Sequence, residues 1–494
     1  MRFLLLIPLF LIWDAQSPAA AAWLHIPRHL GLPTFFFGYC LLILLTRIWG
    51  RRLSYGVIKG DTGRAVDRFN IGMAIARGLI PVWFAVGVYC LGWGNPILGP
   101  IARWPVATPA MLLGLMPGLL AWTGLWWGQF PVDRAMREQN LLYQLEADLP
   151  VVAPPDFRGY FTHKLRGQLL FVLVPWTAIK VLLDLSGLVM QGISHTAIGG
   201  HWLSHAPVKE FSDSAVSFAC VLVVLMISPE LLRHVLDTQK IPESPLRESL
   251  SDICRRSGVS CREILIWHTQ NNLGNAAVMG LVPWVRYVML SDLLLKSMTT
   301  EQIQAVFAHE LGHVKHRHLV WFVVFLLTFS LAISALLVML ESHLTLTTSQ
   351  QQAYDITSNV GCGLVLLLAY GFLSRWFERQ ADVYAARTVQ LAALPVAVGA
   401  DLTTDAAIEY SGEHSGASIF ASALHRVALV NNIPINARNW THGSIASRMR
   451  YIRQFGRDPQ IAERFDRTTR RVLWGLSVLI IICTAIAVYG GLRG

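Results

Sequence analysis

Long apolar runs alternate with polar segments along the 494 residues of the chain. A membrane-spanning helix needs about 17–25 predominantly apolar residues, and these runs reach or approach that length. The runs occupy residues 34–49, 71–93, 106–127, 168–190, 215–230, 319–340, 358–374 and 472–490. This pattern predicts a mainly α, polytopic membrane protein with about eight transmembrane helices.

A further, shorter apolar run lies at residues 3–13, behind Arg2 and ahead of an alanine-rich stretch at 19–22. This order of basic, apolar and small residues is typical of a cleavable signal peptide. An uncleaved short first span fits the same pattern, so residues 1–22 are predicted to be one or the other. We expect the N-terminal multi-span region to follow at residues 23–230.

The composition agrees with a membrane protein, since 53% of the residues are hydrophobic and only 15% are charged. A soluble globular chain carries about 25% charged residues, so an ordinary soluble enzyme and a disordered chain are both excluded. The 41 lysines and arginines exceed the 31 acidic residues and give a net charge of +10. In membrane proteins such an excess gathers in cytoplasmic loops, so the positive charge needs no nucleic acid to explain it. We therefore predict a lipid bilayer, and no nucleic acid, as partner.

The positive charges alternate from one predicted loop to the next. Segments 50–70, 128–167, 231–318 and 376–471 contain 5, 5, 10 and 12 lysines and arginines. Segments 14–33, 94–105, 191–214 and 341–357 contain 1, 1, 1 and 0. The long polar segments are therefore predicted to face the cytoplasm.

Two long polar segments are together large enough for one soluble domain. We expect the first half of this domain at residues 231–318 and the second half at 375–471. A transmembrane hairpin at 319–374 separates the two halves, and a C-terminal transmembrane helix follows at 472–494. The chemistry of the protein is expected in these two halves.

The first half contains a helix with a metal-binding pattern. Thr299 and Gln302 form a predicted capping box at its start. His309 and His313 belong to an HExxH sequence, and residues four apart lie on the same face of a helix. Two imidazoles at that spacing can bind one Zn²⁺, while Glu310 suits the role of a base. A chance arrangement of two histidines on an amphipathic helix would produce the same spacing.

The segment after the hairpin carries two carboxylates, Glu378 and Asp382, on one face of a predicted helix. Carboxylates that face the same way repel each other unless a cation lies between them. Pairing with the nearby Arg375 and Arg379 explains the same pattern without a metal. The residues alone leave these two interpretations open.

Three motifs together resemble the M48 family of membrane zinc peptidases, which contains the Ste24-type CAAX prenyl proteases and the HtpX heat-shock peptidases. The run 298–313 is similar to the active-site helix of that family. Residues 374–382 resemble its second-helix ExxxD pattern, and residues 275–280 resemble its motif at the substrate-binding edge. The resemblance covers residues 258–460, in order.

The resemblance implies an α+β zincin-type (gluzincin) catalytic domain facing the cytoplasm, with one Zn²⁺ per chain. It implies that His309, His313 and Glu378 bind the zinc and that Glu310 is the general base. It also implies that Asp382 orients one of the ligand imidazoles.

Further roles are implied for residues near the site. The resemblance implies catalytic helpers at His442 and Arg448 and a substrate-binding edge formed by Asn275, Ala276, Ala277 and Val278. Gly443 stands where the family has proline, and a solvent-exposed loop histidine is the alternative interpretation of His442.

Four other polar residues are singled out by their positions. Lys180 and Asp184 lie one helical turn apart within a predicted span, where charges are costly. They either line a hydrated chamber or form a structural pair. His316 and His318 follow the zinc-binding pattern and are interpreted as interfacial residues rather than ligands.

The predicted function is that of a zinc-dependent endopeptidase in a membrane, which we expect to be the bacterial inner membrane. Its substrates would be membrane-associated or lipid-modified proteins, hydrolysed by water that the zinc activates with Glu310 as general base. Damaged membrane proteins and prenylated C-termini are the two competing substrate classes. The alternative is a non-catalytic membrane scaffold or receptor with a structural zinc site.

Overall fold

The computed structural model describes most of the chain. The described residues are 27–59, 62–93, 107–146, 153–196, 206–341, 344, 347–393, 415–431, 433–458 and 460–491. The predicted signal peptide or first span at residues 1–22 lies outside them. The chain divides into two compact units: Met1–Thr238 with His268–Asn272, and Gln239–Trp267 with Leu273–Gly494.

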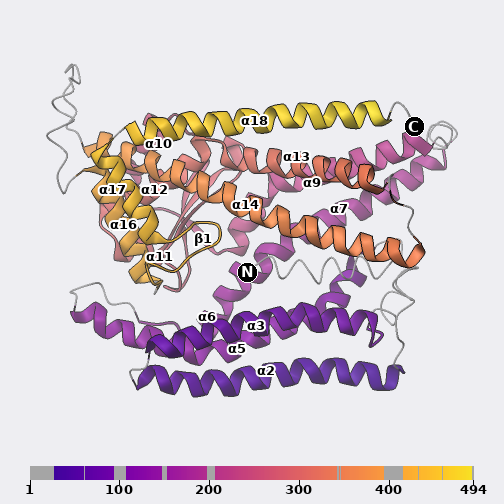
Figure 1. The fold of residues 1–494 in the computed structure, drawn as a ribbon. Helices are drawn as coiled ribbons and strands as arrows, with labels where there is room; N and C mark the ends of the chain where they lie inside the picture. The colour runs from indigo at the N-terminus through magenta and orange to yellow at the C-terminus, as the bar shows by residue number, and fades with distance from the viewer. Residues whose placement is uncertain are drawn as a thin grey trace. The chain divides into compact units, whose positions relative to one another are not determined.

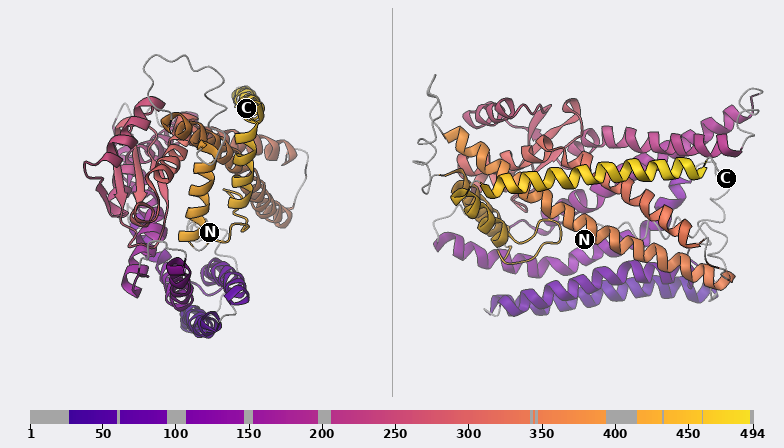
Figure 2. Two further views of the ribbon diagram at one scale, coloured as in Figure 1. Left: turned by 90° about the vertical axis from the view of Figure 1, so that its left-hand side faces the viewer. Right: turned by 45° about the horizontal axis from the view of Figure 1, so that its top comes forward.

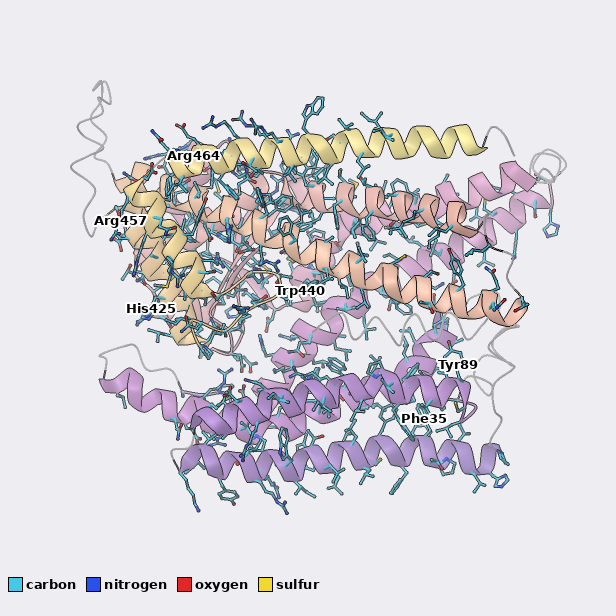
Figure 3. All side chains as sticks on the ribbon, viewed as in Figure 1. Phe35, Tyr89, His425, Trp440, Arg457 and Arg464 are labelled. Carbon is cyan, nitrogen blue, oxygen red and sulfur yellow. The ribbon has the colours of Figure 1, made fainter. Side chains whose placement is uncertain are left out.

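The first unit is built of long helices. They are α2 (Arg28–Ile58), α3 (Thr62–Tyr89), α5 (Thr108–Glu146), α6 (Phe157–Lys164), the π-helical turn η3 (Leu165–Leu170), α7 (Phe171–Ser194) and α9 (Ala206–Val235). Helices α2, α3 and α5 run side by side (Figure 1). Buried aromatic residues such as Phe35 fill the space between them (Figure 3). Helices α2 and α5 pack closely, since a Cβ on Gly50 would lie only 2.2 Å from the Gly128 carbonyl oxygen.

Among the described residues of the first unit, five helices are long and apolar enough to cross a membrane. They are His29–Ile58, Ala65–Tyr89, Thr108–Gln139, Phe157–Ser194 and Ala215–Val235. The other three predicted spans lie within the helices α13, α14 and α18 described below, and the count of eight spans stays a prediction. The chain is an integral membrane protein.

The intramembrane residues Lys180 and Asp184 lie on α7. Asp184 Oδ2 accepts hydrogen bonds from the backbone N–H and the hydroxyl group of Thr108, at 2.8 and 2.6 Å. This carboxylate therefore satisfies a backbone donor at the start of α5 that the helix itself leaves unpaired. The contact favours a structural role for Asp184.

The second unit combines helices with a small sheet. Its elements are β1 (Thr238–Lys240), α10 (Pro245–Ser257), β2 (Glu263–Trp267), β3 (Ala276–Met279), the 3₁₀ turn η4 (Pro283–Val285), β4 (Tyr287–Ser291), α11 (Asp292–Ser297), α12 (Thr300–Lys315), α13 (His318–Glu341), α14 (Thr348–Ala393), α16 (Gly416–Val430), α17 (Ile445–Arg457) and α18 (Gln460–Gly491). Figure 2 shows α13, α14 and α18 extending from the sheet region as long helices.

The sheet has the strand order β1-β2-β4-β3. Strand β4 pairs with β2 in parallel and with β3 in antiparallel orientation. All five residues of β4 are buried, which agrees with its place inside the sheet. Strand β3 stands at the end of this order, so one of its edges faces away from the sheet.

The core of the second unit joins segments that are far apart in sequence. Its buried residues come from 241–311 and from 383–455. Helix α14 is continuous over 46 residues, so the predicted span at 358–374 and the polar helix after it are one rod. Helix α12 contacts β3, α14 and α16. This packing brings the carboxylates of α14 to the histidines of α12.

Candidate metal centre

Helix α12 forms because its local sequence favours it. The Thr299 hydroxyl accepts from the Gln302 N–H, and the Gln302 side chain accepts from the Thr299 N–H, each at 3.3 Å. The predicted capping box is thus present. Apolar residues of the helix, including Ile303 and Phe307, are buried in the core. The cap and the buried apolar side chains therefore hold the helix in place, including its C-terminal half with the HExxH sequence.

The two histidines of this sequence face each other. His309 Nε2 and His313 Nε2 lie 3.3 Å apart, and both rings turn towards α14. Glu378 on α14 approaches both: Oε2 is 3.6 Å from His309 Nε2, and Oε1 is 3.6 Å from His313 Nε2. The three residues offer ligand atoms that lie within 4.8 Å of one another. The structure thus brings together the three predicted ligands.

Small residues allow the two helices to come this close. A Cβ on Gly312 would lie 3.1 Å from Ala381 Cα and 3.2 Å from a ring carbon of Tyr384. Ala381 is completely buried at this crossing. Larger side chains at these positions would force α12 and α14 apart and separate the carboxylate from the imidazoles.

The donor set suits a zinc ion. Zinc is bound by imidazole nitrogens and carboxylate oxygens at about 2.0–2.1 Å in tetrahedral geometry, which places neighbouring ligand atoms about 3.3–3.4 Å apart. The two imidazole nitrogens lie 3.3 Å apart, close to that spacing, and each lies 3.6 Å from a different oxygen of Glu378. The chemistry of these three side chains and their proximity, with one ligand atom of each within 4.8 Å of the others, fit a zinc ion.

Asp382 lies behind His309, one helical turn beyond Glu378. Its Oδ1 is 3.0 Å from His309 Nδ1, the ring nitrogen that faces away from the other ligands. Asp382 is fully buried. A carboxylate in this place holds the imidazole so that Nε2 keeps its lone pair for a metal.

Arg448 on α17 binds both carboxylates of α14. Its Nε donates to Asp382 Oδ2 at 2.9 Å, and its Nη2 donates to Asp382 Oδ1 at 2.6 Å. Its Nη1 lies 3.3 Å from Glu378 Oε2. The nearby Arg375 instead donates to the Trp440 carbonyl at 2.7 Å. The guanidinium of Arg448 is thus the partner of the buried carboxylates.

His442 lies in the loop between α16 and α17. Its Nδ1 is 2.8 Å from Glu378 Oε1, while 53% of its side chain is exposed. Asn439 shapes this loop, because its side-chain oxygen accepts from the backbone N–H groups of Thr441 and His442. Gly443 has φ of 74°, which proline cannot adopt. The departure from the His-Pro pattern therefore has a conformational reason.

Glu310 faces the edge of the sheet. The Val278 N–H of β3 donates to Glu310 Oε2 at 3.2 Å. The neighbouring Asn275 is anchored to the sheet, since its backbone N–H donates to the Ser291 hydroxyl at 2.9 Å. Ala276, Ala277 and Val278 belong to β3 itself. The predicted substrate edge and the predicted base are thus adjacent.

Burial and charge set the pKa values of these groups. Burial raises the pKa of Glu310 to about 7. Burial favours a higher pKa for Glu378 too. The neighbouring Arg448 and His309 outweigh this effect and hold the pKa of Glu378 well below the usual range. Burial lowers the pKa of His309, yet Asp382 and Glu378 raise it to about 9. Glu378 is therefore anionic at neutral pH, which is the state that binds a cation.

A model of Peptidase family M48 matches residues 241–455 of the chain. This segment, somewhat less than half of the chain, is thus similar to peptidase family M48. It contains every residue of the centre described above, from the β3 edge to Arg448 on α17.

Proteins similar to the chain carry the name Protease HtpX homolog. One from Aeropyrum pernix is 31% identical over 109 residues, which are 22% of this chain and 34% of that protein. The chain thus spans about a third of that relative. One from Neisseria meningitidis serogroup C is 25% identical over 224 residues, which are 43% of this chain and 77% of that protein.

A solved structure is also similar to the chain. The crystal structure of S. mikatae Ste24p aligns with 86% of this chain and 99% of its own chain. The TM-score is 0.45 and the sequence identity is 14%.

A cavity of about 1160 Å³ lies beside the candidate metal ligands. Its lining includes the three candidate ligands, the β3 edge and Leu319 and Phe322 on the first turns of α13. Phe420 of α16 closes another side, with its ring stacked 5.7 Å from that of His309. The cavity is large enough for several residues of an extended peptide beside the candidate ligands.

His318 is a site residue that the sequence interpretation missed. It was expected at the membrane interface, but only 1% of it is exposed. Its Nδ1 lies 2.8 Å from His313 Nδ1. No local spacing rule signals this contact, because α12 ends at Lys315 and a turn precedes His318. His316, by contrast, ends α12 and stacks on His318 at 5.7 Å.

We expect an Arg448→Met variant to lose about 3–5 kcal/mol of unfolding free energy, because the Asp382 carboxylate would remain buried without its partner. Unfolding of the purified protein in detergent, followed by circular dichroism, measures this loss. The matched control is Arg450→Met on the exposed side of the same helix. Equal losses in the two variants would contradict the pairing as a source of stability.

Proposed function

We propose that the chain is a zinc-dependent endopeptidase of the membrane that hydrolyses peptide bonds of membrane-associated or lipid-modified proteins. The observation that carries this proposal is the convergence of His309, His313 and Glu378 beside Glu310. The match of residues 241–455 to a model of Peptidase family M48 supports it.

His309, His313 and Glu378 would hold the zinc ion. When bound there, zinc supplies a Lewis acid that polarises a peptide carbonyl and makes water more acidic. Three protein ligands and one open position are typical of catalytic zinc, whereas structural zinc has four protein ligands. Among the described residues, the group that can hold a metal here has three members. The open position favours the enzyme over the alternative of a scaffold with a structural zinc.

Glu310 would act as the general base. Its carboxylate takes a proton from the attacking water and then gives this proton to the nitrogen of the departing amine. The Val278 N–H, which donates to Glu310 Oε2 at 3.2 Å, holds the carboxylate beside the substrate edge. The reaction thus needs one carboxylate that can both accept and release a proton at the same place.

The substrate would bind along β3. Because β3 stands at the end of the strand order, an extended peptide can add to its outer edge through backbone hydrogen bonds. Asn275, Ala276, Ala277 and Val278 would form this edge. Their small or short side chains leave room for a peptide in the cavity, whose apolar lining would select apolar substrate residues.

His442 and Arg448 would assist in different ways. His442 is half exposed and borders the cavity, so its imidazole can donate to the oxygen that becomes negative during hydrolysis. Arg448 is held by Asp382 and Glu378, and we propose that it mainly keeps these carboxylates charged and in place.

We propose that residues 231–318 and 375–471 form a single catalytic domain facing the cytoplasm, separated by the hairpin 319–374. The shared core of residues from both halves supports one domain. The excess of lysine and arginine in these segments supports the cytoplasmic orientation. We propose the bacterial inner membrane as the location of this protein.

The test is cleavage by the purified full-length protein in detergent. We expect cleavage of an unfolded membrane protein or of a prenylated C-terminal peptide, and the preferred substrate identifies the class. A chelator should abolish cleavage, and added zinc should restore it, since the ligands hold a removable ion. Cleavage that persists after the zinc has been removed would contradict the proposal.

A further inference from the structure

The chain breaks sharply between α12 and α13. Helix α12 ends at Lys315, and Arg317 adopts the left-handed conformation with φ of 54°. A non-glycine residue pays a conformational cost in this region, so the surrounding contacts must hold it there. The turn places His318, the first residue of α13, against the face of α12 that carries His313.

His318 is fixed on three sides. Its Nδ1 lies 2.8 Å from His313 Nδ1, and its Nε2 lies 3.0 Å from Gln380 Oε1 on α14. Its ring is stacked on Phe377, with 4.2 Å between the ring centres and 3° between the ring planes. His318 is 1% exposed and Gln380 is 8% exposed, so both nitrogens of His318 depend on these partners.

The chemistry of the partners determines which atoms donate. The carbonyl oxygen of Gln380 only accepts, so His318 Nε2 must carry the hydrogen. A neutral imidazole has one donor and one acceptor, so His318 Nδ1 accepts and His313 Nδ1 donates. His313 then keeps the lone pair on Nε2, the atom that faces Glu378 at 3.6 Å.

We propose that His318, anchored by Gln380, is a positioning residue that fixes the tautomer and the orientation of His313 for the metal. This inference rests on the proposed function, because it requires a metal at the centre. The two ligand imidazoles would then be oriented by different partners: His309 by the carboxylate of Asp382, and His313 by a neutral imidazole.

A neutral partner suits the charge of the site. Glu310, Glu378 and Asp382 already place three carboxyl groups around the two ligand histidines, with Arg448 as their cationic partner. Another carboxylate behind His313 would add repulsion in a buried place. An imidazole offers the same acceptor without a charge, and its flat ring stacks on Phe377.

The test separates the acceptor of His318 from its packing. His318→Phe keeps a ring that can stack on Phe377 but removes the acceptor, whereas His318→Asn keeps an acceptor oxygen near the place of Nδ1. Zinc affinity of the full-length protein is measured by chelator competition, and the absorption spectrum of the Co²⁺-loaded protein reports ligand geometry. Thermal unfolding of the metal-free protein checks the fold of each variant.

We expect His318→Phe to weaken zinc binding about 10–100-fold and to change the Co²⁺ spectrum, as loss of an outer partner does at metal sites. His318→Asn should bind zinc within a few-fold of the unmodified protein. Gln380→Leu, which leaves the ring in place, should weaken zinc binding about tenfold because Nε2 loses its acceptor.

Three outcomes would overturn the inference. Unchanged zinc affinity in His318→Phe and Gln380→Leu would show that the acceptor has no role. A loss of zinc affinity in His318→Asn that His318→Phe does not share would indicate packing alone. If the unmodified protein binds no zinc, both the proposed function and this inference fail. If it binds zinc and the variants bind zinc equally well, only this inference fails.

Discussion

Replacing Glu310 by glutamine is expected to lower the turnover number about 10²–10⁴-fold, the usual contribution of a general base. The glutamine amide cannot take a proton from water, while its carbonyl oxygen can still accept from the Val278 N–H. His309, His313 and Glu378 are unchanged, so the variant should retain one zinc ion per chain. Initial rates of substrate cleavage and elemental analysis of the purified protein measure the two quantities.

The matched control is Glu301→Gln, in the exposed first turn of the same helix. Its rate should equal that of the unmodified protein, since its carboxylate lies far along the helix from the ligands. A Glu310→Gln variant that cleaves as fast as this control would show that another group accepts the proton.

The second large effect is expected for Glu378→Ala, which removes the only predicted ligand on α14. Two imidazoles remain, and the loss of zinc affinity should exceed the roughly 10–100-fold caused by removing an outer partner. Cleavage should fall to background together with the zinc content. Arg448 retains its two hydrogen bonds to Asp382, so the crossing of α14 and α17 should survive.

Glu243→Ala is the control for this variant, because Glu243 is exposed and pairs with Arg247 at the surface. It should keep both zinc and activity. One zinc ion per chain in Glu378→Ala would mean that other residues bind the metal, and the ligand set proposed above would be wrong.

The two variants are informative as a pair. Glu310→Gln separates chemistry from metal binding, whereas Glu378→Ala removes both. A scaffold with a structural zinc predicts another result: Glu310→Gln would change nothing measurable, and Glu378→Ala would lower stability. The pair therefore distinguishes the enzyme from the non-catalytic alternative.

Local features of the site could be predicted from the sequence. The capping box of Thr299 and Gln302 formed as expected, because it depends only on residues three apart. The proximity of His309 and His313 on one face of α12 followed from helical periodicity. The left-handed conformation of Arg317, which follows the end of α12, has no such signal in the spacing of residues.

Contacts between distant segments could not be predicted from local patterns. Whether Glu378 and Asp382 flank a cation or pair with neighbouring arginines was open in the residues alone. The structure places Asp382 against His309 and against Arg448, 66 residues away. The contact of His318 with Gln380 joins residues 62 apart. These pairs exist because of how the helices cross.

The sequence by itself determined the apolar helices, the helix with the HExxH pattern and the presence of a second, acidic helix. Each of these depends on hydrophobic periodicity or on spacing within one or two helical turns. Only the tertiary structure decided which groups meet around His309 and His313, because that depends on the close crossing of α12 and α14 at Gly312 and Ala381. Packing of this kind places side chains from separate segments within bonding distance, and no local pattern contains that information.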